Sequence, residues 1–352
     1  MNISIKASTP YEVVIKRGIL KNAGKIASNY IKPCNALIIT DDKVGPLYLD
    51  TLKKTLEENG FSVNTYTFKN GEQSKNIDTF ADILNYIAEL KMTRGDVIFA
   101  LGGGVCGDLS GFSASSYLRG IKFIGVPTTF LAAVDSSVGG KTGINLKSGK
   151  NLAGAFHQPS LVLCDPDTFK TLPENVFADG VAEALKSGII ADSSLFNMFL
   201  NGSFLENIDY VVSACVKIKG QIVESDEFES GKRKLLNLGH TVGHAVEKCS
   251  DYSITHGHAV AIGMAIVARA AEKSNLSGKE TCEKILSALK MCNLPTSSDF
   301  GVDELCEVIL NDKKRKGDFV TFVIPERIGK CVLKDISVCD IKNFISLGME
   351  EL

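Results

Sequence analysis

Short apolar segments alternate with segments of helical period through the first half of this chain, and this alternation restricts its fold more than any other feature. Five segments have the character of strands: NALIIT, FSVNTYTF, DVIFALG, KFIGVP and LVLCD. The stretches TLKKTLEENG and NIDTFADILNYIAELKM between them carry apolar residues at helical spacing. Repeated strand-then-helix units with buried strands are typical of a parallel sheet covered by helices on both faces. We therefore predict an N-terminal α/β domain over residues 1–170.

The pattern changes after TLPENVF. From Ala178 to about Leu310 nearly every segment has helical period, and strand-like runs return only at DFVTFVIP and KCVLKDI. We predict a second, mainly α-helical domain over residues 171–352. No linker rich in proline, glycine or serine separates the two, so we expect a large shared interface with the ligand site in the cleft between the domains.

Charge and composition exclude several classes of protein. The 352 residues carry a formal net charge of −2, which gives no reason to expect nucleic acid or a membrane surface as partner. The segment MNISIKASTPYEVVIKRG alternates like an edge strand or hairpin and is no signal peptide, and every apolar run is shorter than the ~18 residues of a membrane span. The ten cysteines occur without any C-x-x-C, which predicts reduced thiols in a cytoplasmic protein.

A glycine-rich turn follows the strand DVIFALG. Gly102, Gly104 and Gly107 form a G-x-G-x-x-G motif before a predicted helix, which favours a Rossmann-like site where the backbone approaches a pyrophosphate. The motif lies about 100 residues into the chain, and the acidic residue expected ~20 positions later is absent. Asp41, at the end of NALIIT, is the candidate carboxylate for a ribose.

Further along, DSSVGGKTG resembles a phosphate-binding P-loop. Gly140, Lys141 and Thr142 fit that motif, but Asp135 stands where its first glycine should be, so an ATPase is not favoured. Arg119, Lys141 and Lys150 all stand beside glycines, as cations do in anion sites, and would suit a phosphate or carboxylate. The alternative is that the two lysines are ordinary solvated surface residues.

Four of the five histidines lie between Leu236 and Met264, which suggests a metal site. His240 and His244 share a helix face, and spacing alone narrowly favours them as the ligand pair, although no glutamate follows His240 as in H-E-x-x-H. His256 would return beside them on an antiparallel helix. Glu183, on an otherwise small and apolar helix, would complete a two-histidine, one-glutamate zinc site, or else form an ion pair with Lys186. His258 is left with a structural role.

Several motifs, in order and spacing over nearly the whole chain, resemble those of the 3-dehydroquinate synthase family of sugar-phosphate cyclases. They are NGEQSK, GGGVCGDLSGFSASSYLRG, VPTTFLAAVDSSVGGKTGIN, GKNLAGAFHQP, TLPENVFADGVAEALKSGII, SDEFESGKRKLLNLGHTVGHAVE and HGHAVAIGM. The resemblance implies NAD and one divalent metal, zinc or alternatively cobalt. It also implies a homodimer in which Arg119 reaches the neighbouring active site.

The resemblance assigns roles to individual residues. The metal ligands it implies are Glu183, His240 and His256, which leaves His244 near the substrate phosphate. The implied catalytic and substrate-binding residues are Arg119, Lys141, Asn151, Lys186, Lys219, Arg233, Asn237, His244 and Lys314. The implied NAD contacts are Asp41, the segment Asn70, Gly71, Glu72, Gln73, Ser74 and Lys75, the turn Gly104, Val105, Cys106, Gly107 and Asp108, then Thr128, Thr129, Asp135, Lys141 and Lys150, and finally Thr168, Phe169, Lys170 and Thr171.

Two positions depart from the family's pattern, and one further assignment has two candidates. Lys43 replaces an asparagine that some members have near the adenosine, and Cys106 replaces an aliphatic residue in the glycine turn. In NDKKRKG, either Lys313 or Lys314 could be the late phosphate contact.

The implied reaction converts 3-deoxy-D-arabino-heptulosonate 7-phosphate into 3-dehydroquinate and phosphate. Its steps would be transient oxidation by NAD, β-elimination of phosphate, re-reduction, ring opening and aldol closure. Three alternatives remain: another sugar-phosphate cyclase (an amino-dehydroquinate, valiolone or scyllo-inosose synthase), a glycerol-type metal-dependent dehydrogenase, or a binding protein without activity.

Overall fold

The computed structural model describes residues 1–310 and 317–350 of the chain. These residues form two compact units, each described here by itself. The first unit consists of Met1–Leu172 with Lys219–Glu227, and the second of Pro173–Ile218 with Phe228–Leu352. Helix α7 (Ile208–Ser225) contributes residues to both units.

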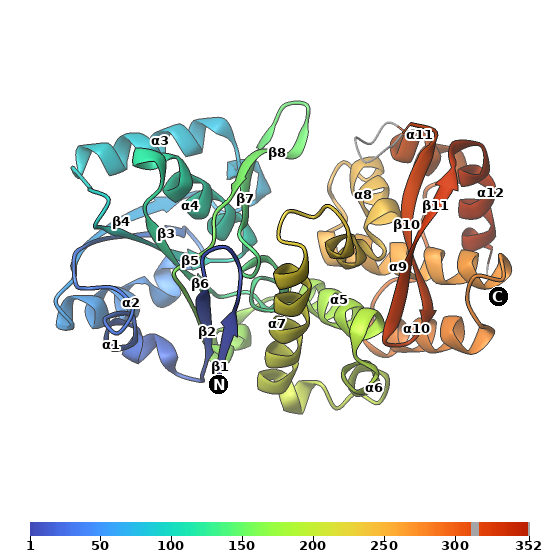
Figure 1. Ribbon diagram of the computed structural model, residues 1–352, viewed down its shortest axis with the longest axis horizontal. Coiled ribbons are helices and arrows are strands. Elements are labelled where there is room, and N and C mark those ends of the chain that lie inside the picture. The colour runs from blue at the N-terminus through green and yellow to red at the C-terminus, as the bar shows by residue number, and fades with distance from the viewer. Residues whose placement is uncertain (311–316, 351–352) are drawn as a thin grey trace. The chain divides into compact units, whose positions relative to one another are not determined.

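The first unit is built on a seven-stranded sheet with the order β1-β2-β9-β6-β5-β3-β4 (Figure 1). Strand β1 pairs with β2 in antiparallel fashion, and every other pairing in the sheet is parallel. The predicted Rossmann-like α/β fold is thereby confirmed. The strands are β1 (Asn2–Ile5), β2 (Tyr11–Ile15), β3 (Asn35–Asp41), β4 (Ser62–Phe68), β5 (Val97–Gly102), β6 (Lys122–Pro127) and β9 (Leu161–Cys164).

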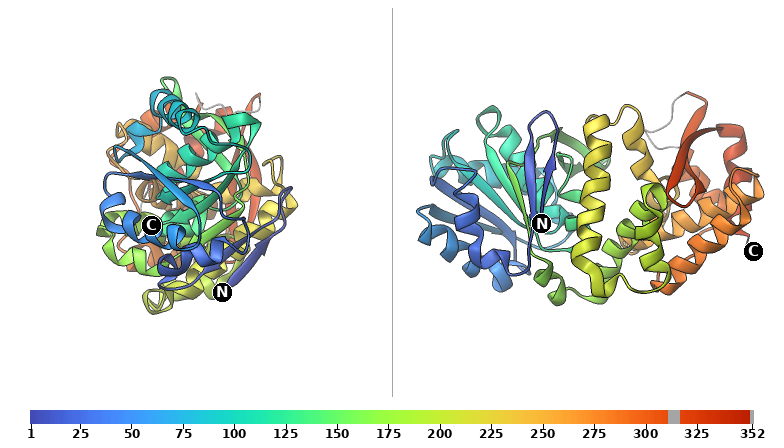
Figure 2. Two further views of the ribbon diagram at one scale, coloured as in Figure 1. Left: turned by 90° about the vertical axis from the view of Figure 1, so that its left-hand side faces the viewer. Right: turned by 60° about the horizontal axis from the view of Figure 1, so that its bottom comes forward.

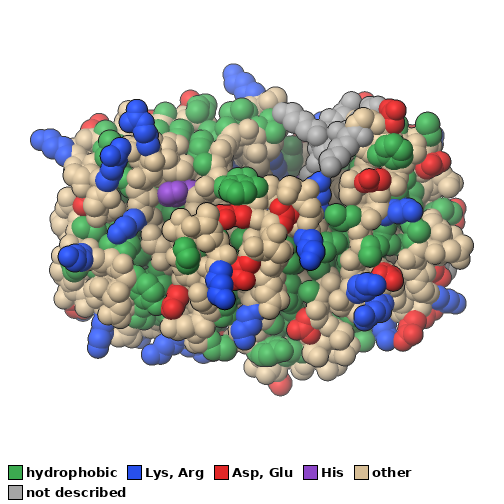
Figure 3. Space-filling model, in the orientation of Figure 1, with side chains coloured by type: hydrophobic (Ala, Val, Ile, Leu, Met, Phe, Trp, Pro, Cys, Tyr) green, Lys and Arg blue, Asp and Glu red, His purple; other side chains and the backbone are tan. Residues whose placement is uncertain are grey.

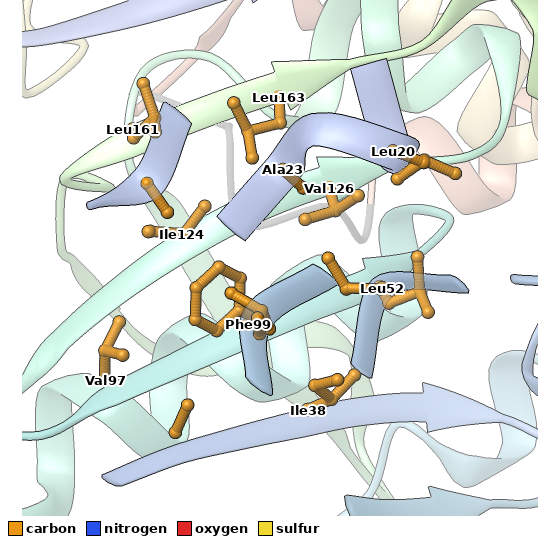
Figure 4. Packing of buried hydrophobic residues seen from close by; sticks show 14 of the residues in the cluster. Leu20, Ala23, Ile38, Leu52, Val97, Phe99, Ile124, Val126, Leu161 and Leu163 are labelled. Atoms are coloured by element: carbon orange, nitrogen blue, oxygen red, sulfur yellow. The ribbon is translucent and has the colours of Figure 1, made fainter. Parts of the chain in front are cut away.

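Both faces of this sheet are buried. Neighbouring residues of a strand point to opposite faces, so they belong to two different hydrophobic cores. Ile38 and Phe99 belong to the core on one face, with α1 (Ala23–Ala27) and α2 (Gly45–Glu58); Figure 4 shows this packing. Ile39 and Ile98, one position away, belong to the core on the other face. Helices α3 (Ile77–Glu89) and α4 (Gly104–Ser116) contribute to that second core. The continuous apolar strands of the sequence follow from this two-sided burial.

A hairpin that the sequence analysis missed follows β6. Strands β7 (Lys141–Leu146) and β8 (Gly149–Phe156) pair antiparallel, outside the main sheet. Lys141 is the first residue of β7 and Lys150 the second of β8, so both lysines lie in strands. Glycine is needed inside this hairpin because a Cβ on Gly154 would lie 2.1 Å from the Thr142 carbonyl oxygen.

The second unit is mainly helical, as predicted, and Figure 2 shows its helices from a second direction. Helix α9 is its centre: buried residues run along almost its whole length, on all sides. Strands β10 and β11 form one antiparallel hairpin where the sequence predicted strands. The elements are α5 (Glu174–Ala191), α6 (Ser193–Leu200), α8 (His240–Cys249), α9 (His256–Lys273), α10 (Lys279–Met291), α11 (Val302–Leu310), β10 (Phe319–Arg327), β11 (Lys330–Ser337) and α12 (Val338–Met349).

Short turns of helix connect these elements in both units. They are the 3₁₀ turns Ile19–Asn22, Glu72–Ser74, Tyr117–Arg119, Pro166–Thr171, Leu205–Asn207 and Lys232–Asn237, and a π-helical turn over Ala132–Ser136.

Helices α8 and α9 approach one another so closely that only glycine fits at their crossing. A Cβ on Gly263 would lie 2.0 Å from the Gly239 carbonyl oxygen, and one on Gly243 would lie 3.0 Å from the Ala259 carbonyl oxygen. Gly239 also has a φ of 78°, a conformation that side chains disfavour. His240 and His256 are the first residues of the two helices, and their ring centroids lie 5.2 Å apart.

Basic and acidic side chains are interspersed on the face shown in Figure 3, in keeping with the small net charge. Among the described residues, no helix combines the length and the apolar character that a membrane span requires.

Candidate active site

Helix α5 carries a buried pair of opposite charges. Glu183 and Lys186 are only 1% and 2% exposed, and the Lys186 ammonium forms an ion pair with Glu183 Oε2. The ion pair considered from the sequence therefore exists. It engages one carboxylate oxygen, and the other, Oε1, faces the two histidines described next.

His240 and His256 both direct Nε2 at the same oxygen of Glu183. The distances to Oε1 are 3.6 Å for His240 and 3.5 Å for His256. In a tetrahedral zinc site with bonds of about 2.0–2.1 Å, neighbouring ligand atoms are about 3.4 Å apart. The three donors thus have the chemistry and the spacing of a metal site, and their ligand atoms all lie within 4.8 Å of one another. This is the set that the resemblance implied, and not the His240–His244 pair that spacing favoured.

His244 lies beside this set. Its ring centroid is 5.4 Å from that of His240 and 6.1 Å from that of His256. Its ring therefore borders the candidate metal centre.

Glu247 is a site residue that the sequence analysis missed. Its Oε2 lies 3.3 Å from Nδ1 of His256. Burial alone would lower the pKa of His256, but hydrogen bonds and charge from Glu183 and Glu247 outweigh it and raise this pKa to about 10. The available signal was position: Glu247 follows His240 by two helical turns, which returns it to the same face of α8.

A second carboxylate, Asp179, ties the start of α9 to α5. Its Oδ1 accepts hydrogen bonds from the Thr255 hydroxyl (2.6 Å) and the His258 backbone N–H (3.2 Å), and it lies 3.0 Å from His258 Nδ1. Gly257 permits this, because a Cβ there would lie 2.2 Å from the Asp179 Cα. Since Asp179 is one turn before Glu183, the contact fixes the spacing between Glu183 and His256. It also gives His258 the structural partners expected of it.

Two further predicted substrate residues precede α8, in the 3₁₀ turn Lys232–Asn237. Arg233 is 1% exposed, an extreme burial for a guanidinium. The Asn237 side-chain amide donates to Glu229 Oε1 at 2.9 Å, and Glu229 is another residue the sequence analysis did not name. Lys314 and Lys313 lie outside the described residues.

In the first unit, the glycine motif forms the predicted strand–turn–helix. Gly102 ends β5 and Gly104 begins α4. The Gly102 carbonyl accepts from the Thr128 backbone N–H at 3.0 Å, and a Cβ on Gly103 would lie 2.9 Å from a Thr129 methyl group. A cavity opens at this turn, with Gly103, Gly107, Asp108 and Lys141 among its lining residues.

Beside α4 lies a network of charged and amide side chains. The buried Lys75 ammonium is 2.5 Å from Asp108 Oδ2 and donates to Asn151 Oδ1 at 2.5 Å. Burial raises the pKa of Asp108, with the neighbouring Lys75 charge opposing the shift. Asn145 completes the network, because its side chain donates to Glu72 Oε1 and accepts from the Asn151 backbone N–H. Asn151 has a left-handed φ of 53°, as tightly positioned functional residues often do.

Lys219, the first residue that α7 contributes to this unit, contacts the π-helical turn. Its ammonium donates to the Asp135 carboxylate at 2.7 Å and to the Asp135 carbonyl at 2.8 Å. The two residues are 84 positions apart, so only the fold reveals that they meet.

The other predicted NAD residues lie where parallel strands end, at one edge of the sheet. Asp41 ends β3, and its Oδ1 accepts from the backbone N–H groups of Lys43 and Val44. Asn70 to Ser74 follow β4, and Thr168 to Thr171 follow β9. Thr171 Oγ1 is 2.6 Å from the Tyr48 hydroxyl, Phe169 packs against Phe130, and Lys170 pairs with Asp167. Ligands of open α/β sheets bind at this carboxyl edge.

Comparison with known proteins agrees with this geometry. Residues 65–179 match the family described as 3-dehydroquinate synthase N-terminal, and residues 180–315 match 3-dehydroquinate synthase C-terminal. The chain is 42% identical over 347 residues to the 3-dehydroquinate synthase of Streptococcus suis, covering 97% of this chain and 98% of that protein.

Two solved structures are similar throughout. The 2-epi-5-epi-valiolone synthase of Streptomyces hygroscopicus, with NAD+ and Zn2+ bound, has a TM-score of 0.87 at 25% identity over 96% of each chain. A 2-deoxy-scyllo-inosose synthase complexed with carbaglucose-6-phosphate, NAD+ and Co2+ has a TM-score of 0.85 at 25% identity, covering 98% of this chain and 99% of that one.

The chain thus has the fold of the sugar-phosphate cyclases, and its helical unit contains a Glu–His–His cluster. Within that class, the chain belongs to the 3-dehydroquinate synthase family. Its activity is that of a carbon–oxygen lyase of the shikimate pathway, acting on a sugar phosphate.

Replacing Asp179 with alanine tests the link between α5 and α9. The variant leaves the Thr255 hydroxyl and the His258 N–H groups without their acceptor, which we expect to lower the free energy of unfolding by about 1–3 kcal/mol. Urea unfolding measures the change. Glu174→Ala, at an exposed position of the same helix, is the control and should change stability by less than ~0.5 kcal/mol. Equal stability of the two variants would contradict a structural role for Asp179.

Proposed function

We propose that this enzyme converts 3-deoxy-D-arabino-heptulosonate 7-phosphate into 3-dehydroquinate and phosphate with NAD and one divalent metal ion, zinc or cobalt. The observation that carries the proposal is the convergence of two imidazole Nε2 atoms on one oxygen of a buried glutamate. The related synthases whose structures contain NAD+ with Zn2+ or Co2+ support it.

Glu183, His240 and His256 would hold the metal. One carboxylate and two neutral imidazoles are a common donor set that leaves a coordination position for substrate. When bound, the metal would acidify adjacent substrate hydroxyls and NAD would accept and later return a hydride. The role of Lys186 follows from its ion pair: it balances part of the Glu183 charge, which would otherwise be costly at 1% exposure.

The anionic ends of the substrate call for cations and neutral hydrogen-bond donors, and the residues that the resemblance implies include both kinds. Lys186, Arg233, Asn237 and His244 come from the second unit, and Arg119, Lys141, Asn151 and Lys219 from the first. Lys186, Lys219 and Arg233 are buried, and buried cations bind anions strongly because little water competes for their charge. We assign these residues to the carboxylate and phosphate of the heptulosonate, and keep Lys314 as a further phosphate contact. Their contribution would be orientation and electrostatic stabilisation.

NAD would lie along the carboxyl edge of the sheet in the first unit. The glycine turn before α4 offers backbone N–H groups to the pyrophosphate, and Asp41 is positioned at the end of β3 for a ribose. We assign Lys75, Asp108 and Lys150 to the same cofactor, together with Thr128, Thr129 and Asp135.

We also propose a cytoplasmic homodimer in which Arg119 serves the neighbouring subunit. Support comes from the backbone, because Leu118 and Arg119 both have left-handed φ values, 48° and 65°. Such strain persists where function requires a particular side-chain position. Sedimentation of the enzyme as a monomer at micromolar concentration would contradict the dimer.

The reaction itself is tested by incubating the enzyme with the heptulosonate phosphate and a catalytic amount of NAD. We expect phosphate to be released in large excess over NAD, without accumulation of NADH, because the hydride returns within each turnover. Phosphate release and the amount of NADH, measured by its absorbance, are recorded in the same reaction. Steady growth of NADH would indicate a dehydrogenase, and absence of phosphate would indicate a binding protein.

Removing a metal ligand should abolish metal binding and activity together. We expect Glu183→Ala and His240→Ala to purify with little zinc and to release phosphate at least ~100-fold more slowly, because each removes a third of the donor set. Zinc content by mass spectrometry and phosphate release are the measurements. His157→Ala, at a histidine of the first unit, is the control that should retain zinc. Full zinc content in either ligand variant would show that the ligands are assigned wrongly.

A further inference from the structure

Glu247 is a buried carboxylate for which the reaction outlined above has no use. It is 4% exposed on α8, and Tyr252 N–H donates to its backbone carbonyl at 2.7 Å where the helix ends. Its side-chain Oε2 lies 3.3 Å from His256 Nδ1, while Nε2 of the same ring lies 3.5 Å from Glu183 Oε1. One imidazole therefore bridges two carboxylates.

His240 has the same arrangement with a different partner. Its Nδ1 lies 3.2 Å from the Leu238 carbonyl oxygen, and its Nε2 lies 3.6 Å from Glu183 Oε1. Carbonyl and carboxylate oxygens only accept hydrogen bonds, so when a metal occupies Nε2, the single proton of each neutral ring belongs on Nδ1. That tautomer leaves the Nε2 lone pair of both rings for a metal. The difference is that His240 donates to a neutral acceptor and His256 to a charged one.

We propose that Glu247 is a positioning residue for the metal: it accepts the Nδ1–H of His256, fixes the tautomer and orientation of that ring, and raises its affinity for the ion. A carboxylate partner makes an imidazole a stronger ligand, and losing such a partner typically weakens metal binding roughly 10- to 100-fold. The inference rests on the metal site proposed above for Glu183, His240 and His256.

The helix crossing explains how Glu247 comes to lie there. Gly243 lies one turn before Glu247 on the same face of α8, and a Cβ on Gly243 would lie 3.0 Å from the Ala259 carbonyl oxygen on α9. The close approach of the two backbones at Gly243 leaves Glu247 facing the first turn of α9, which begins at His256.

A competing arrangement makes Glu247 a direct ligand, together with His244 and His256, whose ligand atoms also lie within 4.8 Å of one another. An ion there would lie on the Glu247 side of the His256 ring. The Glu183 carboxylate, which is 1% exposed and faces two Nε2 atoms, would then have no ion. The spacing of these three donor atoms nevertheless fits one. We therefore favour Glu247 as the outer partner of His256, and the experiment separates the two arrangements.

The test compares metal affinity of metal-free proteins, without substrate or NAD. The Glu247→Gln variant keeps the size of the side chain but removes the charge, and we expect it to bind zinc and cobalt roughly 10- to 100-fold more weakly than the unchanged protein. Competition with a chromophoric chelator measures the dissociation constants. The matched control is Glu283→Gln, the same change at an exposed position of α10, which should leave them unchanged.

The visible spectrum of bound cobalt distinguishes positioning from ligation. A positioning role predicts weaker binding with the band pattern of the unchanged protein, whereas loss of a ligand would alter the coordination bands and overturn the inference. Unchanged affinity in Glu247→Gln would overturn it as well. If Glu247→Gln does not fold, as judged by thermal unfolding of the metal-free protein, the shorter Glu247→Asp is held to the same criteria.

The metal site on which the inference rests has its own test in the same titration. Glu183→Gln should lose zinc binding. If Glu183→Gln binds zinc as tightly as the unchanged protein, the proposed site is wrong. If Glu183→Gln loses zinc and Glu247→Gln does not weaken it, only the role of Glu247 is wrong.

Discussion

The second unit depends on one buried carboxylate. A charged glutamate is costly to remove from water, and Glu183 is 1% exposed. Its environment offsets that cost with opposite charge: the Lys186 ammonium on one oxygen and two imidazoles on the other. A divalent ion would complete the neutralisation of the Glu183 charge. It would take the place of an imidazolium proton on the side of the histidines and carry a larger positive charge. The packing of α5, α8 and α9 is thus inseparable from the chemistry of their side chains.

The dinucleotide site proposed for the first unit depends on backbone more than on side chains. Parallel strands bring residues that are far apart in sequence to one edge of the sheet. Glycines then clear space for a ligand, and a lysine–aspartate pair supplies charge beside it.

Local patterns in the sequence predicted much of this structure. The strand, the glycine turn and the helix around Gly102–Gly107 were predicted because each is decided by neighbours in sequence. The β7–β8 hairpin was missed because glycines and lysines there look like a loop, and its pairing is visible only in the fold. Spacing favoured His240 with His244 because helical period reports only one helix, whereas the convergence on Glu183 joins three. Glu247 was missed because a single glutamate near a helix end is usually solvated.

The glycine crossing of α8 and α9 has a consequence for the choice of metal. With no side chain between the backbones at Gly263, the helices are already at their closest approach, and α5 is held to the start of α9 by Asp179. The distances between the backbone positions that carry the donors are therefore set by the main chain, which leaves only side-chain rotation to adjust the donor atoms. Ions that take bonds of about 2.0–2.2 Å can exchange within such a frame. A larger ion such as calcium, with bonds of about 2.3–2.6 Å and a need for six to eight oxygens, is poorly matched to two imidazoles and one carboxylate in such a frame.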